Sequence, residues 1–225
     1  MLENAIGYPW RGEQKIRTVA VGGVLSVFYT LIIPGLLLHG YQIRVFRQVC
    51  AGDTDGAPAF DDWDELLTDG LVGGVIMLVY GVGFMTPFGL SVVVFLPFAA
   101  TSADSGGALA IAGVVAALLL SLVAFAVGIA LIYLFPAALA AYAVTGEFRS
   151  AFSPSTLRTI GGDKSYLLGV LLAILLNMAV QLVGSMLVFT IIGILFLPFI
   201  GFYGSVAGFY TIGAGVADTS LVSPE

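Results

Sequence analysis

Charged side chains are scarce in this sequence: Asp, Glu, Lys and Arg make up 10% of its 225 residues, against about 25% in ordinary soluble domains. Cysteine occurs once, at Cys50, which excludes an intrachain disulfide and a cysteine zinc cluster. The 8 basic residues are outnumbered by 14 acidic ones. The sequence therefore lacks the basic footprint of a nucleic-acid-binding protein, and we expect no nucleic-acid partner.

Histidine is as rare as cysteine. His39 is the single histidine, and the nearest charged residue is Arg44, about one helical turn further on. A histidine metal site or a Ser-His catalytic pair needs partners that this neighbourhood does not offer. We expect His39 to lie at the membrane interface without a special role.

Motifs of catalysis and cofactor binding are also missing. Asp53 and Asp55 begin like a calcium loop, but Ala57 stands where a third ligand belongs. The spacing in residues 204–208 (GSVAG) differs from the G-x-S-x-G nucleophile elbow, and no HExxH occurs. The sequence predicts a protein that is not an enzyme and that holds no cofactor or metal.

Hydrophobic residues are abundant: they make up 59% of the chain, and the mean hydropathy is +1.06. Four long runs carry no charge, at residues 18–43, 70–103, 105–146 and 165–217. Because about 20 apolar residues suffice to cross a bilayer as a helix, the last run is long enough for two spans. We therefore predict an all-α polytopic membrane helix bundle, a single membrane domain over residues 1–225. Its five or so transmembrane helices are expected at about 18–38, 71–97, 108–135, 165–187 and 191–215.

The first of these spans is ambiguous. Five full spans place the N-terminus on the outer side of the membrane, although it carries Arg11, Lys15 and Arg17. The positive-inside rule disfavours bases on that side. Either these bases are tolerated there, or residues 18–49 form a re-entrant hairpin broken at Pro34-Gly35. The length of 18–38 favours a full span.

Two loops are expected to carry short amphipathic helices at the membrane interface. In residues 60–71, Phe60, Trp63 and Leu67 recur at helical spacing, with acids on the other faces. We expect these three side chains to be an interfacial contact for membrane lipid or for a protein partner. In the second loop, Ser153-Pro154 is a good helix start, because a capping side chain precedes proline at the first helical position.

These two loops also suggest an internal repeat. Pro34 and Tyr41 near the first loop correspond to Pro136 and Tyr142 near the second. The repeats cover about 18–97 and 108–187, with a half repeat at about 191–217, and their order predicts copies of parallel orientation. The bases of loops 39–70 and 146–164 then predict that both loops are cytoplasmic in a multi-pass protein of the cell membrane.

Two amides lie deep in a predicted span. Asn177 and Gln181 are four residues apart and so share one helix face. A hydrogen bond to a neighbouring helix is one interpretation of this intramembrane pair. Contact with a transported solute is the other.

Three segments carry a resemblance to a known family: YPWRGEQKIRTVAVGG, IIPGLLLHGYQIRVFR and PAFDDWDELLTDGL. They resemble the archaeal membrane proteins grouped as domain of unknown function four-zero-one-three, over about residues 1–217. The resemblance implies no activity, substrate or site residue. The function that we predict is a non-enzymatic module that interacts with lipid or with a protein, and the alternative is a small-solute permease or transporter component.

Overall fold

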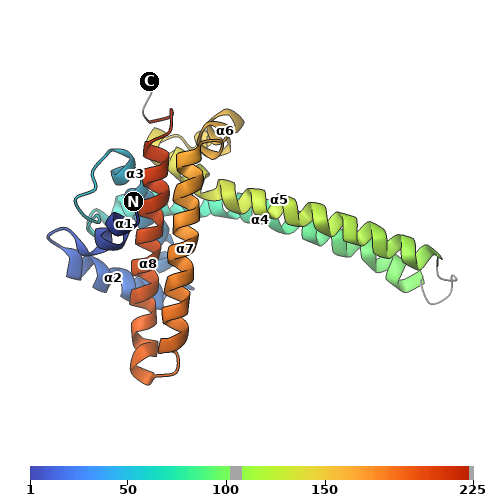
Figure 1. Cartoon of the computed structure of the whole chain (residues 1–225), viewed down its shortest axis with the longest axis horizontal. Helices are drawn as coiled ribbons and strands as arrows, with labels where there is room; N and C mark the ends of the chain where they lie inside the picture. The colour runs from blue at the N-terminus through green and yellow to red at the C-terminus, as the bar shows by residue number, and fades with distance from the viewer. Residues whose placement is uncertain (102–107, 223–225) are drawn as a thin grey trace. The chain divides into compact units, whose positions relative to one another are not determined.

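A computed structural model describes residues 1–101 and 108–222 of the chain (Figure 1). These residues form helices and turns and no strand, which confirms the predicted all-α class. Four helices are long and apolar enough to cross a membrane within the described ranges, so the approximate count of five becomes four. They are α4 (Trp63–Thr101), α5 (Ala108–Thr145), α7 (Lys164–Leu187) and α8 (Ile191–Ala217).

The surfaces of these helices identify the medium around them. In the most apolar stretches of α4, α5 and α7, 11% of the residues are buried, and in α8 the share is 28%. Helices that are apolar all round and still exposed are stable in hydrocarbon but not in water. The chain is therefore an integral membrane protein.

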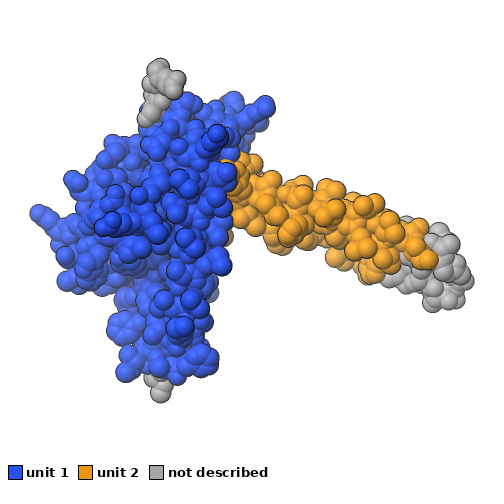
Figure 2. Space-filling model, in the orientation of Figure 1, with its two compact units in different colours: residues 1–76, 136–225 blue, residues 77–135 orange. Residues whose placement is uncertain are grey.

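The chain divides into two units (Figure 2). Unit 1 comprises residues 1–76 and 136–225, and unit 2 comprises residues 77–135. In unit 2 the later part of α4 packs against the first part of α5. A Cβ added at Gly128 of α5 would lie 2.9 Å from the ring of Phe84 of α4, so a glycine is needed there. The connection between α4 and α5, residues 102–107, lies outside the described residues.

The predicted first span, 18–38, is wrong. The chain forms α2 (Lys15–Val27) and α3 (Ile32–Cys50), separated by a break at residues 28–31. The 13 residues of α2 are about 20 Å long, shorter than the roughly 30 Å hydrocarbon core. Pro34 does not cause the break, because it lies in the first turn of α3, where its missing N–H has no helical partner to lose.

The segments before α2 and after α3, the two ends of the α2–α3 hairpin, pack against each other. The segment before α2 holds the short helices α1 (Leu2–Gly7) and η1 (Tyr8–Trp10) and packs on the loop after α3. The N–H of Ala57 donates to the carbonyl of Tyr8 at 3.3 Å, and the Thr18 hydroxyl donates to the carbonyl of Pro58 at 3.5 Å. The N-terminal bases therefore lie on the same side as this loop, which removes the conflict with the positive-inside rule.

The first predicted interfacial helix is not a separate element. Its apolar and acidic residues from Trp63 onward are the first turns of α4, which runs on without a break. The predicted start of the second helix is confirmed: the hydroxyl of Ser153 accepts from the N–H of Thr156 at 3.5 Å and caps α6 (Pro154–Gly161). Its location at the membrane interface stays a prediction. The 3-10 helix η2 (Phe148–Phe152) precedes α6.

Glycines bring α3 and α4 into backbone contact. A Cβ added at Gly40 would lie 1.9 Å from the carbonyl oxygen of Leu66, and one added at Gly70 would lie 1.9 Å from that of Leu36. No side chain fits at such distances, so only glycine permits this crossing. The same closeness is typical of small residues at membrane helix interfaces.

The crossing of α7 and α8 has the same register. A Cβ at Gly169 would lie 2.5 Å from the Thr211 carbonyl oxygen, and one at Gly215 would lie 2.5 Å from that of Ser165. In both crossings each glycine faces the carbonyl four residues before the partner's glycine. This accords with the predicted repeat, in which α7 corresponds to α4 and α8 to α3. The repeat itself stays a prediction.

Candidate functional site

The residues predicted as an interfacial contact have different positions in the structure. Phe60 is 2% exposed and stacks on Tyr41, with ring centroids 4.3 Å apart and planes at 12°. It belongs to the interior of unit 1 and is not available to a partner. Trp63 and Leu67 are 44% and 41% exposed, so they alone remain as candidate contacts.

The acids of the same segment are occupied by two arginines of α3. Arg44 pairs with the carboxylate of Asp61 and, at 3.1 Å, with that of Glu65. Arg47 pairs with Glu65 at 3.0 Å and binds both carboxylate oxygens of Asp69, at 2.9 and 3.1 Å. We call these five residues the ion-pair cluster. Charges that the sequence pattern assigns to a solvated face are thus used to join α3 to α4.

Asp69 is the buried member of the ion-pair cluster. Its side chain is 7% exposed and also accepts the hydroxyl of Tyr142 of α5 at 3.0 Å. The carboxylate therefore has a partner at each oxygen, as a buried charge requires. With its three helices joined in this way, the cluster has the character of a structural clamp and not of a ligand site.

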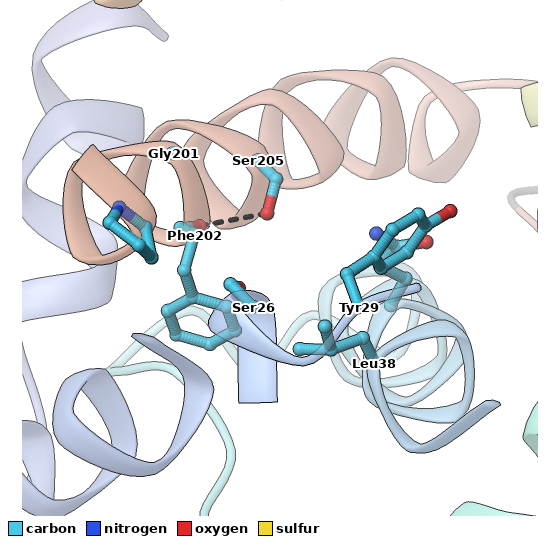
Figure 3. A pocket seen from close by; sticks show the side chains of 8 residues that line it. Ser26, Tyr29, Leu38, Gly201, Phe202 and Ser205 are labelled. Atoms are coloured by element: carbon cyan, nitrogen blue, oxygen red, sulfur yellow. Dashed lines mark hydrogen bonds between the residues drawn. The ribbon is translucent and has the colours of Figure 1, made fainter. Parts of the chain in front are cut away.

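A cavity of about 370 Å³ lies between the α2–α3 hairpin and α8 (Figure 3). This volume is at the lower end of small-molecule sites, which are about 300–1,000 Å³. Its lining comes from α2, the break at 28–31, α3 and α8, all within unit 1. The lining residues are Ser26, Tyr29, Leu38, Gln42, Pro198, Gly201, Phe202 and Ser205.

Two residues that line the cavity, Tyr29 and Gln42, are connected by hydrogen bonds through His39. The Tyr29 hydroxyl lies 3.3 Å from His39 Nε2, and His39 Nδ1 lies 3.2 Å from Gln42 Oε1. Because an amide oxygen only accepts, Nδ1 carries the proton, and the neutral ring accepts from Tyr29 at Nε2. The side-chain NH₂ of Gln42 keeps both donors, since it has no acceptor in the described part of the chain.

The hydroxyl groups of the two cavity serines already donate to backbone carbonyls. The Ser26 hydroxyl donates to the carbonyl of Gly22 at 2.7 Å, and that of Ser205 donates to Phe202 at 2.8 Å (Figure 3). Their oxygens remain as acceptors. Leu38, Pro198 and Phe202 add apolar surface to the same lining.

The sequence analysis missed this cavity. His39, expected to have no special role, holds Tyr29 and Gln42 together. Asn177 and Gln181 are exposed on α7 and do not line the cavity. The first uncharged run contains a cluster of hydrogen-bonding side chains, which could have indicated a polar site. The alternative of a re-entrant hairpin concerns the same part of the chain.

Two titratable groups at this end of unit 1 are strongly affected by burial. Burial raises the pKa of the Cys50 thiol to about 12. Burial also raises the pKa of Tyr8, whose hydroxyl has no hydrogen-bond partner in the described ranges. Both groups are therefore neutral over the physiological range, and neither adds charge near the cavity.

Comparison with known proteins identifies a family. A family model described as a protein of unknown function (DUF4013) matches residues 24–189, which is well over half of the chain. The matched range covers the hairpin side of the cavity and ends before the residues that α8 contributes. No curated protein and no solved structure matches the chain.

Proposed function

The chain belongs to the DUF4013 family of proteins of unknown function, and on that premise we propose that it is a non-enzymatic membrane module that binds a lipid headgroup in the cavity. The observation that carries this is a cavity lined by both polar and apolar side chains and built partly from the membrane-spanning helix α8. Residues 198–205 lie well inside that span, so the cavity is at membrane depth.

Access from the lipid supports this function. Tyr29 and Gly201 line the cavity and are both exposed, so they form its rim. A headgroup can enter there while the acyl or alkyl chains remain in the bilayer. The volume of about 370 Å³ suits a headgroup and the start of a chain, not a whole lipid.

The hydrogen bonds of the cavity support a role in binding and not in catalysis. Nucleophilic catalysis needs a serine within hydrogen-bond reach of a base. Here Ser26 and Ser205 donate to helix carbonyls. His39 is held by Tyr29 and Gln42 instead.

Filling the cavity provides the test. Gly201 has no heavy atom within 4 Å of the position of an added Cβ, so Gly201→Leu places a side chain at the rim without a clash. We expect this variant to retain at least about ten-fold less lipid, a loss of about 1.4 kcal/mol of binding free energy. Native mass spectrometry of protein released from nanodiscs measures the retained lipid.

Gly89→Leu is the matched control, because Gly89 is also a helical glycine with open space around it, and it lies outside the cavity. It should retain lipid like the parent protein. Equal lipid retention by Gly201→Leu and Gly89→Leu would refute the proposed function.

A permease is the second candidate. The break at 28–31 is irregular backbone beside a cavity at membrane depth, which is a feature of solute sites in transporters. In that case, proteoliposomes should show a solute flux that Gly201→Leu blocks. The flux should survive replacement of Asn177 and Gln181 by Leu, since both amides lie outside the cavity.

We further propose that loops 39–70 and 146–164 are cytoplasmic. Contacts of Cys50 with the Gly213 carbonyl and of Gly215 with Ser165 bring the end of α3, the start of α7 and the end of α8 together. These are the ends that carry the two loops, and the loops hold the bases that the positive-inside rule assigns to the cytoplasm.

Labelling of introduced cysteines tests this topology. In whole cells, a membrane-impermeant maleimide is expected to label Phe189→Cys, at the 90% exposed connection of α7 and α8, but not Asp55→Cys or Ser155→Cys. Inside-out vesicles should give the reverse. The native Cys50 is buried, with its pKa raised to about 12, and so leaves little background. Labelling of the two loop cysteines from outside would invert the assignment.

A further inference from the structure

The cavity is built without charge. None of its eight lining residues is Asp, Glu, Lys or Arg. The nearest basic residues along α3, Arg44 and Arg47, are paired with carboxylates of the ion-pair cluster. A phosphate, carboxylate or ammonium group placed in the cavity would lose hydration without a counter-charge, which costs several kcal/mol. The headgroup that fits is therefore uncharged.

The side chains that line the cavity offer both hydrogen-bond donors and hydrogen-bond acceptors that no other group of the described residues occupies. The Gln42 NH₂ offers donors, while the oxygens of Tyr29, Ser26 and Ser205 offer acceptors because their protons are used elsewhere. A ligand group that only accepts hydrogen bonds would pair with Gln42 alone. A ligand group that only donates them would leave the NH₂ of Gln42 without a partner. Hydroxyl groups donate and accept, so several hydroxyls on one ligand satisfy the whole lining.

From these two properties we infer that the cavity selects an uncharged polyol, the head of a neutral glycerolipid or glycolipid. This inference rests on the proposed function and specifies its ligand. Gln42 is the residue that determines specificity, since it supplies the side-chain donors and is held in place by His39. Phe202 and Pro198 contact the C–H surface of the polyol and the first carbons of the chain.

The test compares how strongly the protein binds lipids with different headgroups. Nanodiscs of phosphatidylcholine containing the full chain are doped with monoglucosyl-diacylglycerol, diacylglycerol, phosphatidylglycerol or phosphatidic acid, and bound lipid is counted by native mass spectrometry. We expect the glucosyl lipid to bind at least about ten-fold better than phosphatidylglycerol or phosphatidic acid. Phosphatidylglycerol is the informative comparison, because it has a polyol head and adds one charge.

The variant that tests the role of Gln42 is Gln42→Met, which keeps the length of the side chain and removes its donors. Binding of the glucosyl lipid should fall at least about ten-fold. Gln181→Met is the matched control, since it removes an exposed amide of α7 that does not line the cavity. If Gln42→Met fails to fold, Gln42→Leu takes its place, because its side chain also lacks hydrogen-bond donors and carries no charge.

The outcomes separate the two proposals. Equal binding of charged and neutral lipids, together with full binding by Gln42→Met, overturns the polyol assignment, and a loss in Gly201→Leu then still supports a lipid site. No loss in Gly201→Leu overturns both. Displacement of the glucosyl lipid by free glucose or glycerol at similar concentration assigns the site to a soluble polyol and overturns the lipid source.

Discussion

Replacement of Gly70 by alanine is expected to lower the stability of unit 1 by about 3 kcal/mol or more. The added methyl would lie 1.9 Å from the carbonyl oxygen of Leu36 and 2.6 Å from its carbonyl carbon. Both atoms are backbone, so no rotamer change relieves the clash, and α3 and α4 must move apart. Separation of these helices also lengthens the ion pairs between them.

Gly89→Ala is the matched control for this prediction. It lies on the same helix, α4, and its added methyl meets no atom within 4 Å. Alanine has the better helix propensity, so this variant should be neutral or slightly more stable. Thermal unfolding in detergent, followed by size-exclusion chromatography, compares the two variants. Equal melting temperatures for Gly70→Ala and Gly89→Ala would contradict the close crossing.

Removal of Asp69 is the second prediction with a large effect. The Asp69 side chain is 7% exposed, and Asp69→Ala leaves Arg47 with Glu65 alone and the Tyr142 hydroxyl without its acceptor. Loss of one partner of a buried pair costs about 3–5 kcal/mol. Since Arg47 is partly exposed and keeps Glu65, we expect the lower end of this range.

Asp64→Ala shows what the loss of an acid costs elsewhere in the same helix. Asp64 is exposed and belongs to none of the ion pairs of the cluster. Its replacement should cost about 0.3–1 kcal/mol, through the helix dipole. Chemical unfolding of both variants gives the comparison. If Asp69→Ala were no less stable than Asp64→Ala, the clamp role of the cluster would be wrong.

Most of the fold could be predicted because hydrocarbon imposes a local rule. A run without charge that is long enough to cross the bilayer is sufficient to place α4, α5, α7 and α8. The start of α6 was equally local, since Ser153 and Pro154 determine it by capping and by a fixed backbone angle.

The α2–α3 hairpin could not be predicted with the same security, because its cause is not local. Gly22 and Gly23 of α2 face Phe202 and Phe199 of α8, with an added Cβ 2.3 and 2.1 Å from those rings. These contacts make the short α2 lie against α8, and no pattern within residues 18–38 reports them. Only the length of residues 18–38 favoured a full transmembrane span.

The cavity was hidden for a related reason. Tyr29 and His39 are 10 residues apart, and they meet only because the chain turns between them. Phe60 presented the converse problem: its spacing with Trp63 and Leu67 fits an amphipathic surface, but the stacked ring of Tyr41 buries it. Tertiary contacts decided both cases.

The contacts of α1 and α3 with α8 also bear on the order in which unit 1 can form during synthesis. Tyr203 donates its hydroxyl to the carbonyl of Ile6, 197 residues away, and Cys50 meets the Gly213 carbonyl, 163 residues away. Helices α1 and α3 thus make these contacts only after α8 has been synthesised. A nascent chain that has not yet reached α8 lacks the rings of Phe199 and Phe202, on which Gly22 and Gly23 of the hairpin pack.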